Sequence, residues 1–140
     1  MQIFYETMSG NTRKLACAMA DELGVRAVDV KDAVIGPDAD LLFLGSGCYG
    51  GVPGKNMIRF IEANDFRGRR IALFGTSGGG EGREVKAMAE AVKRKGGDVI
   101  GSYHCKGKVL PALYLINRRH PDAAEVDAAR KFAREMAALV

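Results

Sequence analysis

The sequence predicts an α/β protein in which helices cover both faces of a doubly wound, five-stranded parallel sheet. Short apolar runs alternate along the chain with segments of helical periodicity. Two of these runs, 41–44 and 71–74, are apolar at every position, which is typical of strands that are covered by helices on both faces. Glycines at 24 and 96–97 follow two of the helical segments, where C-terminal caps are needed.

The expected elements follow one another regularly from the N-terminus. A first strand, 2–5, leads into a helix, 12–23, whose apolar residues share one face. Gly24 ends this helix, and the strand 25–30 follows it. The remaining elements alternate in the same way, with strands at 41–45, 70–74 and 98–103 and helices at 54–62, 84–95 and 123–139. No internal repeat or linker interrupts this order, so residues 1–140 are expected to form one domain.

One connection is longer than the roughly two to six residues that usually join a strand to a helix. It runs from Cys105 to His120, and its apolar stretch, 109–116, is broken by Pro111. Such a stretch is suited to covering the sheet edge, to forming a dimer contact or to shielding a bound ligand.

Composition and charge exclude several classes of protein. The chain is 47% hydrophobic and has no apolar run near the ~20 residues of a membrane span, so we expect neither disorder nor membrane insertion. Three cysteines are too few for a disulfide framework, and Met1 leads into the first strand without a signal peptide, so a cytoplasmic location is expected. The net charge of +4 comes from scattered cations without interleaved aromatics, which argues against nucleic-acid binding.

The loop after the first strand has the composition of a phosphate site. Thr7-Met8-Ser9-Gly10-Asn11-Thr12 combines hydroxyls, an amide and a glycine immediately before a helix. A helix N-terminus attracts anions because its first N–H groups lack intrahelical partners and its dipole is positive there. The signature of a Walker loop is missing, and no loop lysine is available for a triphosphate, so a single terminal phosphate is expected. The alternative is an ordinary helix N-cap, which also prefers Ser, Thr and Asn.

Two further strands end in glycine-rich loops, at 45–51 and 75–82. In an open parallel sheet, ligands bind beyond the carboxyl ends of the strands, where the strand order reverses. Glycine lets the backbone approach a flat ligand closely and adopt positive φ. Flexible turns without function are the alternative explanation for one such loop alone. Together with the phosphate loop, the two loops predict one binding site at the carboxyl edge of the sheet.

These motifs resemble those of the flavodoxins, and specifically of the short-chain type. The resemblance covers nearly the whole chain, through Tyr5-x-Thr7-x-Ser9-Gly10-Asn11-Thr12, Leu44-Gly45-Ser46-Gly47-Cys48-Tyr49-Gly50 and Phe74-Gly75-x-x-Gly78-x-Gly80-x-Gly82. It implies a flavodoxin-like sheet of strand order 2-1-3-4-5 and a non-covalently bound FMN. The cofactor-binding residues that it implies are Thr7, Met8, Ser9, Gly10, Asn11 and Thr12 at the phosphate, Ser46, Gly47, Cys48, Tyr49 and Gly50 in the first ring loop, and Thr76, Ser77, Gly78 and Gly79 in the second.

The resemblance also implies roles for individual residues of the ring loops. Tyr49 would stack on one face of the isoalloxazine ring, and the Gly50-Gly51 peptide would turn over to offer its carbonyl to the half-reduced ring. Glycine suits this position because both orientations of the peptide need permissive dihedral angles. Two features depart from the family pattern. Gly79 stands where such flavodoxins often have an aromatic side chain, and the net charge is positive rather than negative.

The other reactive side chains are expected to be structural. Cys17 falls on the apolar side of its helix, and Cys48 is better explained as a small packing residue than as a redox-active thiol. His104 and His120 lack ligand spacing to any cysteine or carboxylate, so no metal is expected. No side chain stands where a general base or nucleophile is needed, so no catalytic residue is predicted and the chemistry would belong to the cofactor.

The preferred function is that of an FMN protein that shuttles electrons between redox partner proteins, as a monomer or homodimer. Two alternatives remain open. A small FMN-dependent reductase would take hydride from a nicotinamide and reduce a quinone or similar acceptor, whereas a domain without FMN would serve as a binding module. Reduction by NADH or NADPH without a partner protein would identify the reductase. A colourless protein that gains no flavin absorbance with added FMN would identify the binding module.

Overall fold

The structure is a computed structural model that describes residues 1–108 and 119–140, so the apolar stretch 109–116 lies outside the described residues. Strands and helices alternate along the chain as expected. The elements are β1 (Gln2–Glu6), α1 (Asn11–Leu23), β2 (Ala27–Asp29), the 3-10 turn η1 (Val30–Asp32), β3 (Leu41–Tyr49), β4 (Val52–Pro53), α2 (Lys55–Ala63), β5 (Arg70–Ser77), α3 (Arg83–Arg94), β6 (Asp98–Lys106) and α4 (Ala123–Ala137).

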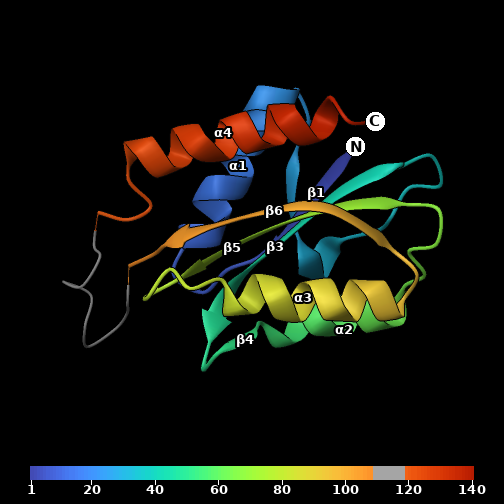
Figure 1. The fold of residues 1–140 in the computed structure, drawn as a ribbon, viewed down its shortest axis with the longest axis horizontal. Helices are drawn as coiled ribbons and strands as arrows, with labels where there is room; N and C mark the ends of the chain where they lie inside the picture. Colours follow the sequence, from blue (N-terminus) through green and yellow to red (C-terminus); the bar gives the residue numbers. More distant parts are fainter. Residues whose placement is uncertain (109–118) are drawn as a thin grey trace.

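Five of the strands form a parallel sheet in the order β2-β1-β3-β5-β6, which confirms the expected order 2-1-3-4-5. Helices α1 and α4 cover one face of this sheet, and α2 and α3 cover the other (Figure 1). The chain runs from β1 outward to β2 and then returns to β3 on the other side of β1. The strand order therefore reverses between β1 and β3, and a ligand-binding crevice is expected beyond their carboxyl ends.

Alternate side chains of the strands enter two separate cores, one on each face of the sheet. In β1, Ile3 packs with residues of α1 and α4, whereas Phe4 packs with residues of α2 and α3. In β3, Phe43 belongs to the first core, and Leu42 and Leu44 belong to the second. Successive side chains of a strand point to opposite faces. Both faces are buried, so these strands are apolar at every position.

The glycine-rich segments continue the sheet further than expected. The third strand was expected to end at residue 45 and the fourth at 74, but β3 reaches Tyr49 and β5 reaches Ser77. Gly45, Gly47 and Gly75 therefore lie within paired strands. A Cβ atom on Gly45 would overlap the ring of Phe74 from the neighbouring strand. These glycines are needed for the space that they leave beside the backbone.

A short hairpin follows β3 and was not among the expected elements. Gly50 and Gly51, with φ of 65° and 84°, turn the chain back into β4, which pairs with the end of β3 in the antiparallel direction. Two consecutive residues with positive φ match a tight hairpin turn, for which Gly-Gly is a favoured sequence. The second strand is shorter than the expected 25–30, because the chain enters η1 at Val30.

Cys17 is exposed on α1, so its expected place in the core is wrong. The buried side of this helix is formed by residues such as Leu15, Ala16 and Met19. Cys17 lies two residues beyond Leu15, which corresponds to about 200° around a helix of 3.6 residues per turn.

Among the described residues, no helix is long and apolar enough to cross a membrane.

Replacing Gly45 by alanine should destabilise the protein, because the added Cβ would force the buried Phe74 ring to move. Overpacking of this kind costs about 1–3 kcal/mol of unfolding free energy. Gly36→Ala is the matched control, since its Cβ would meet Gln2 at an ordinary 3.7 Å, and it should leave stability unchanged or raise it by up to about 1 kcal/mol. Urea unfolding measures both variants, and equal stabilities would contradict the packing of Phe74 on Gly45.

Candidate ligand-binding site

A cavity of about 310 Å³ lies beyond the carboxyl ends of β1, β3 and β5, where the strand order predicts a crevice. Most of the residues expected to bind a cofactor line it. They are Thr7, Met8, Ser9, Asn11 and Thr12 from the phosphate loop, Gly47, Cys48 and Tyr49 from the end of β3, and Thr76, Ser77 and Gly78 from the end of β5. The fold thus brings the three predicted loops to one place.

The remaining expected residues lie beside this cavity. Gly10 is the N-cap of α1, and Gly50 is in the hairpin turn. The Ser46 hydroxyl is buried, accepts the N–H of Gly54 and donates to the Gly47 carbonyl, each at 2.8 Å. Gly79 lines a second hollow of about 160 Å³ that shares Cys48, Ser77 and Gly78 with the cavity. We call this second hollow the side pocket.

The N-termini of α1 and α3 both have a glycine N-cap and, among the described residues, no side-chain cap, whereas carboxylates accept N–H groups at those of α2 and α4. The N-cap of α1, Gly10, adopts φ of 87° and has no side chain to accept a hydrogen bond. At the start of α2, by contrast, the Glu6 carboxylate accepts the N–H of Met57 at 2.8 Å. Asp122 caps α4 in the same way. The first N–H groups of any α-helix lack intrahelical partners. Those of α1 adjoin the cavity and can bind an anion there.

Two hydroxyl interactions connect the phosphate loop to the other strands. The buried hydroxyls of Thr12 and Thr76 lie 3.0 Å apart, which ties the start of α1 to the end of β5. The Met8 N–H donates to the Tyr49 hydroxyl at 3.0 Å, and the Tyr49 ring lies across Gly47. Tyr49 thus spans from the end of β3 to the phosphate loop, and burial raises the pKa of its hydroxyl.

Lys108 also lines the cavity, although no lysine was expected there. The Asn11 side chain donates to the backbone carbonyl of Lys108 at 3.0 Å, which holds the segment after β6 against the start of α1. The two residues are separated by 97 positions in the sequence. No local motif marks this contact, because it depends on where β6 lies in the sheet.

Cys48 lines both the cavity and the side pocket. Burial and the nearby Glu84 carboxyl raise its pKa above the ordinary value of a cysteine. A thiol is a good nucleophile only as the thiolate. The raised pKa therefore disfavours the reactive thiolate of Cys48.

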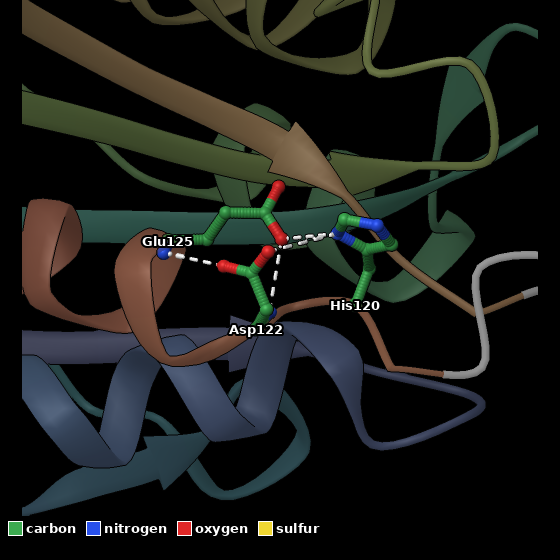
Figure 2. Close-up of side chains that lie close together, drawn as sticks. All are labelled: His120, Asp122 and Glu125. Carbon is green, nitrogen blue, oxygen red and sulfur yellow. Dashed lines mark hydrogen bonds and ion pairs between the residues drawn. The ribbon is translucent and has the colours of Figure 1, made fainter.

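His120, Asp122 and Glu125 lie together at the start of α4 (Figure 2), so the expectation that His120 has no ligand spacing to a carboxylate is wrong. Their possible ligand atoms all lie within 4.8 Å of one another. Asp122 accepts the N–H of Glu125 at 2.8 Å, and Glu125 accepts both the N–H of Asp122 at 2.9 Å and a hydrogen bond from His120 Nδ1. The second Glu125 oxygen accepts the N–H of Lys106 at 3.3 Å. The cluster is thus a capping box that also fastens α4 to the end of β6.

Comparison with known proteins agrees with the strand order and the overall fold described above. The model of a family described as a flavodoxin domain matches residues 2–118. A flavodoxin from Clostridium beijerinckii is 30% identical over 91% of this chain and 92% of its own length, and the flavodoxin-like domain-containing protein BilS from Clostridioides difficile is 26% identical over 96% and 94%. The solved structure of a Fusobacterium nucleatum flavodoxin bound to flavin mononucleotide has a TM-score of 0.72 at 18% identity and covers 96% of this chain and 95% of its own. The chain belongs to the flavodoxin domain family.

Proposed function

We propose that this protein binds FMN non-covalently and carries electrons between redox partner proteins. The observation that carries the proposal is the cavity between the uncapped N-terminus of α1 and the glycine-rich ends of β3 and β5. A relative of the same fold from Fusobacterium nucleatum was solved with flavin mononucleotide bound. Membership of the flavodoxin domain family supports the same cofactor.

The residues at the cavity fit the phosphate of FMN. A phosphate at the start of α1 would accept the N–H groups of the first helical turn and the hydroxyls of Ser9 and Thr12, and it would meet the positive end of the helix dipole. Lys108, which lines the same cavity, would add a positive charge. Capture of the phosphate by backbone N–H groups requires no loop lysine of the Walker type.

The ring of FMN would lie toward the two glycine-rich loops. Tyr49 is the aromatic side chain expected to stack on it, and its hydroxyl accepts the N–H of Met8 in the phosphate loop. Gly50 and Gly51 form a turn whose backbone is free of side-chain restraint. When bound, FMN would supply the redox chemistry, while the protein would bind it, orient it and limit its contact with water.

The affinity for FMN should exceed that for riboflavin by orders of magnitude, because riboflavin lacks the phosphate. Each charge-assisted hydrogen bond to a phosphate is worth about 1.5–3 kcal/mol. Thr12→Val keeps the size of the side chain and removes the hydroxyl, so it should weaken FMN about ten- to hundredfold and leave riboflavin nearly unchanged. Fluorescence titration of both flavins measures the effect.

Equal affinities of the wild-type protein for FMN and riboflavin would show that the phosphate loop does not bind phosphate. A protein that gains no flavin absorbance at all would instead support the binding module without FMN. The riboflavin titration is the internal control, since a variant that has lost its fold would lose both flavins.

Gly79 favours a second candidate function, that of an FMN-dependent reductase. This residue is exposed, and the side chain near its Cα belongs to Glu81, which is itself exposed. Without an aromatic side chain here, the outer face of the ring would be open to a small planar molecule such as a nicotinamide. Hydride transfer requires this direct stacking, whereas exchange of electrons with a partner protein does not.

Gly79→Trp should separate the two functions. The backbone at Gly79 does not need positive φ, and a side chain would displace only the end of Glu81. If the protein is a carrier, the added aromatic ring should tighten FMN about two- to tenfold, in line with ~0.5–1.5 kcal/mol for an aromatic pair. Transfer of electrons to a protein partner should continue. If it is a reductase, oxidation of NADH or NADPH by a small quinone should stop. An unchanged affinity and turnover would mean that Gly79 does not face the ring.

A further inference from the structure

Glu84 is a buried carboxyl group that the proposed binding of FMN does not explain. It lies in the first turn of α3, and its exposed fraction is 0%. Among the described residues, neither carboxyl oxygen has a hydrogen-bond partner. The carboxyl group occupies the place of a side chain on Gly75, because a Cβ there would overlap it. Burial of a polar group without a partner costs stability and is rare in folded proteins.

The carboxyl group lies between a thiol at the cavity and an imidazole at the surface. Ser46 of β3, Gly75 of β5 and His104 of β6 are neighbours across the sheet, and Cys48 is two residues beyond Ser46 on the same face. Cys48 lines the cavity and the side pocket, whereas His104 is exposed and lines a separate hollow next to α4. Glu84 interacts with both Cys48 and His104.

The surroundings favour the protonated carboxyl group. An ionised carboxylate without a hydrogen bond or a paired cation is strongly disfavoured in a protein interior. Burial therefore raises the pKa of Glu84, and the weaker effects of its own backbone N–H, the Cys48 thiol and the charge of His104 lower it by less. Buried groups with shifted pKa values are typical of functional sites, and Cys48, with which Glu84 interacts, lines the cavity.

We propose that Glu84 is a proton-binding site linked to electron uptake at the FMN site, a role that rests on the proposed function. Reduction of bound FMN by a partner protein would add negative charge at the cavity that Cys48 lines. In the pH range where Glu84 titrates, a proton from solvent then binds the ionised fraction of Glu84 and forms the neutral acid. The carboxylate gains an O–H bond, the partner is oxidised, and the proton offsets the added charge. On reoxidation the proton returns to solvent.

The other titratable and charged groups around Glu84 do not account for the expected pH dependence. On β3 the titratable neighbour is Cys48, and on β6 the neighbours are His104 and Cys105, whose pKa is raised to about 12, mainly by burial. β4 has no titratable side chain, and the charged residues of α2 are exposed. On the loop and α3, Glu81 and Arg83 pair with each other at 2.9 Å in solvent. His104 is thus the neighbour that lowers the pKa of Glu84 electrostatically, and it is exposed.

The first experiment tests the proton site without FMN. Wild-type protein, Glu84→Gln and the control Glu90→Gln, which changes an exposed glutamate of the same helix, are unfolded with urea at a series of pH values. A folded pKa above the unfolded value of 4.5 means that the linked stability is complete below pH 4.5 and is lost as the pH rises through the folded pKa. Wild-type protein and Glu90→Gln should therefore lose stability relative to Glu84→Gln in this window, by up to tenfold in the unfolding equilibrium constant per pH unit.

Parallel pH curves for wild-type protein and Glu84→Gln would overturn the proton site. If Glu84→Gln does not fold, a titration of the Glu84 carboxyl carbon by NMR in the wild-type protein measures the same ionisation. A pKa at or below 4.5 would then be the result that overturns it.

The second experiment tests the link to electron uptake. The midpoint potential of the FMN-loaded protein is measured against pH for the same three proteins. Wild-type protein and Glu90→Gln should take up to one more proton per reduced molecule than Glu84→Gln, within the pH range where Glu84 titrates. Identical pH dependences of all three proteins would contradict the link while leaving FMN binding intact. Failure of the wild-type protein to bind FMN would instead overturn the proposed function, and the redox link with it.

Discussion

Three glycines at the carboxyl ends of β3 and β5 leave space in the sheet that side chains from elsewhere fill. The Phe74 ring lies against Gly45, Tyr49 lies across Gly47, and the Glu84 carboxyl covers Gly75. A larger residue at any of these positions would have to displace its neighbour. The backbone of β3 and β5 can therefore stay paired up to the edge of the cavity. The site depends on these absent side chains as much as on the hydroxyls of the phosphate loop.

The helix N-termini differ in whether a carboxylate side chain accepts their first N–H groups. Glu6 satisfies the start of α2, and the capping box of Asp122 and Glu125 satisfies the start of α4. These three carboxylates would repel an anion, which disfavours both helix ends as phosphate sites. At α1 the N-cap is Gly10, and the polar side chains around it are hydroxyls and an amide, which carry no negative charge. The absence of a carboxylate there keeps the site open to a phosphate.

The elements and their order could be predicted from the sequence because apolar runs and helical periodicity are local signals. The loop proposed to bind phosphate could also be picked out from the sequence, since its residues are contiguous, and most of them line the cavity. Lys108 and Glu84 were missed for the opposite reason: each meets its neighbours only after the sheet has assembled. The partners of His120 lie two and five residues further along the chain, and the Asp-x-x-Glu spacing of a capping box was a local signal for them. The hairpin at Gly50 and Gly51 did have a local signal, a Gly-Gly pair between two short β segments. For Cys17, counting residues around the helix from Leu15 would have placed the thiol on the exposed side.

The electrostatics of the site depend more on burial than on the net charge of the chain. The excess of four positive charges is spread over the surface, where salt screens interactions beyond ~8–10 Å. Arg83 beside the side pocket is further neutralised by its pair with Glu81. Glu84 lies in the interior, where a charge is screened much less than on the surface. The unusual basic composition is therefore a weak guide to the electrostatics of the cavity, and the protonation state of one buried carboxyl group is a stronger one.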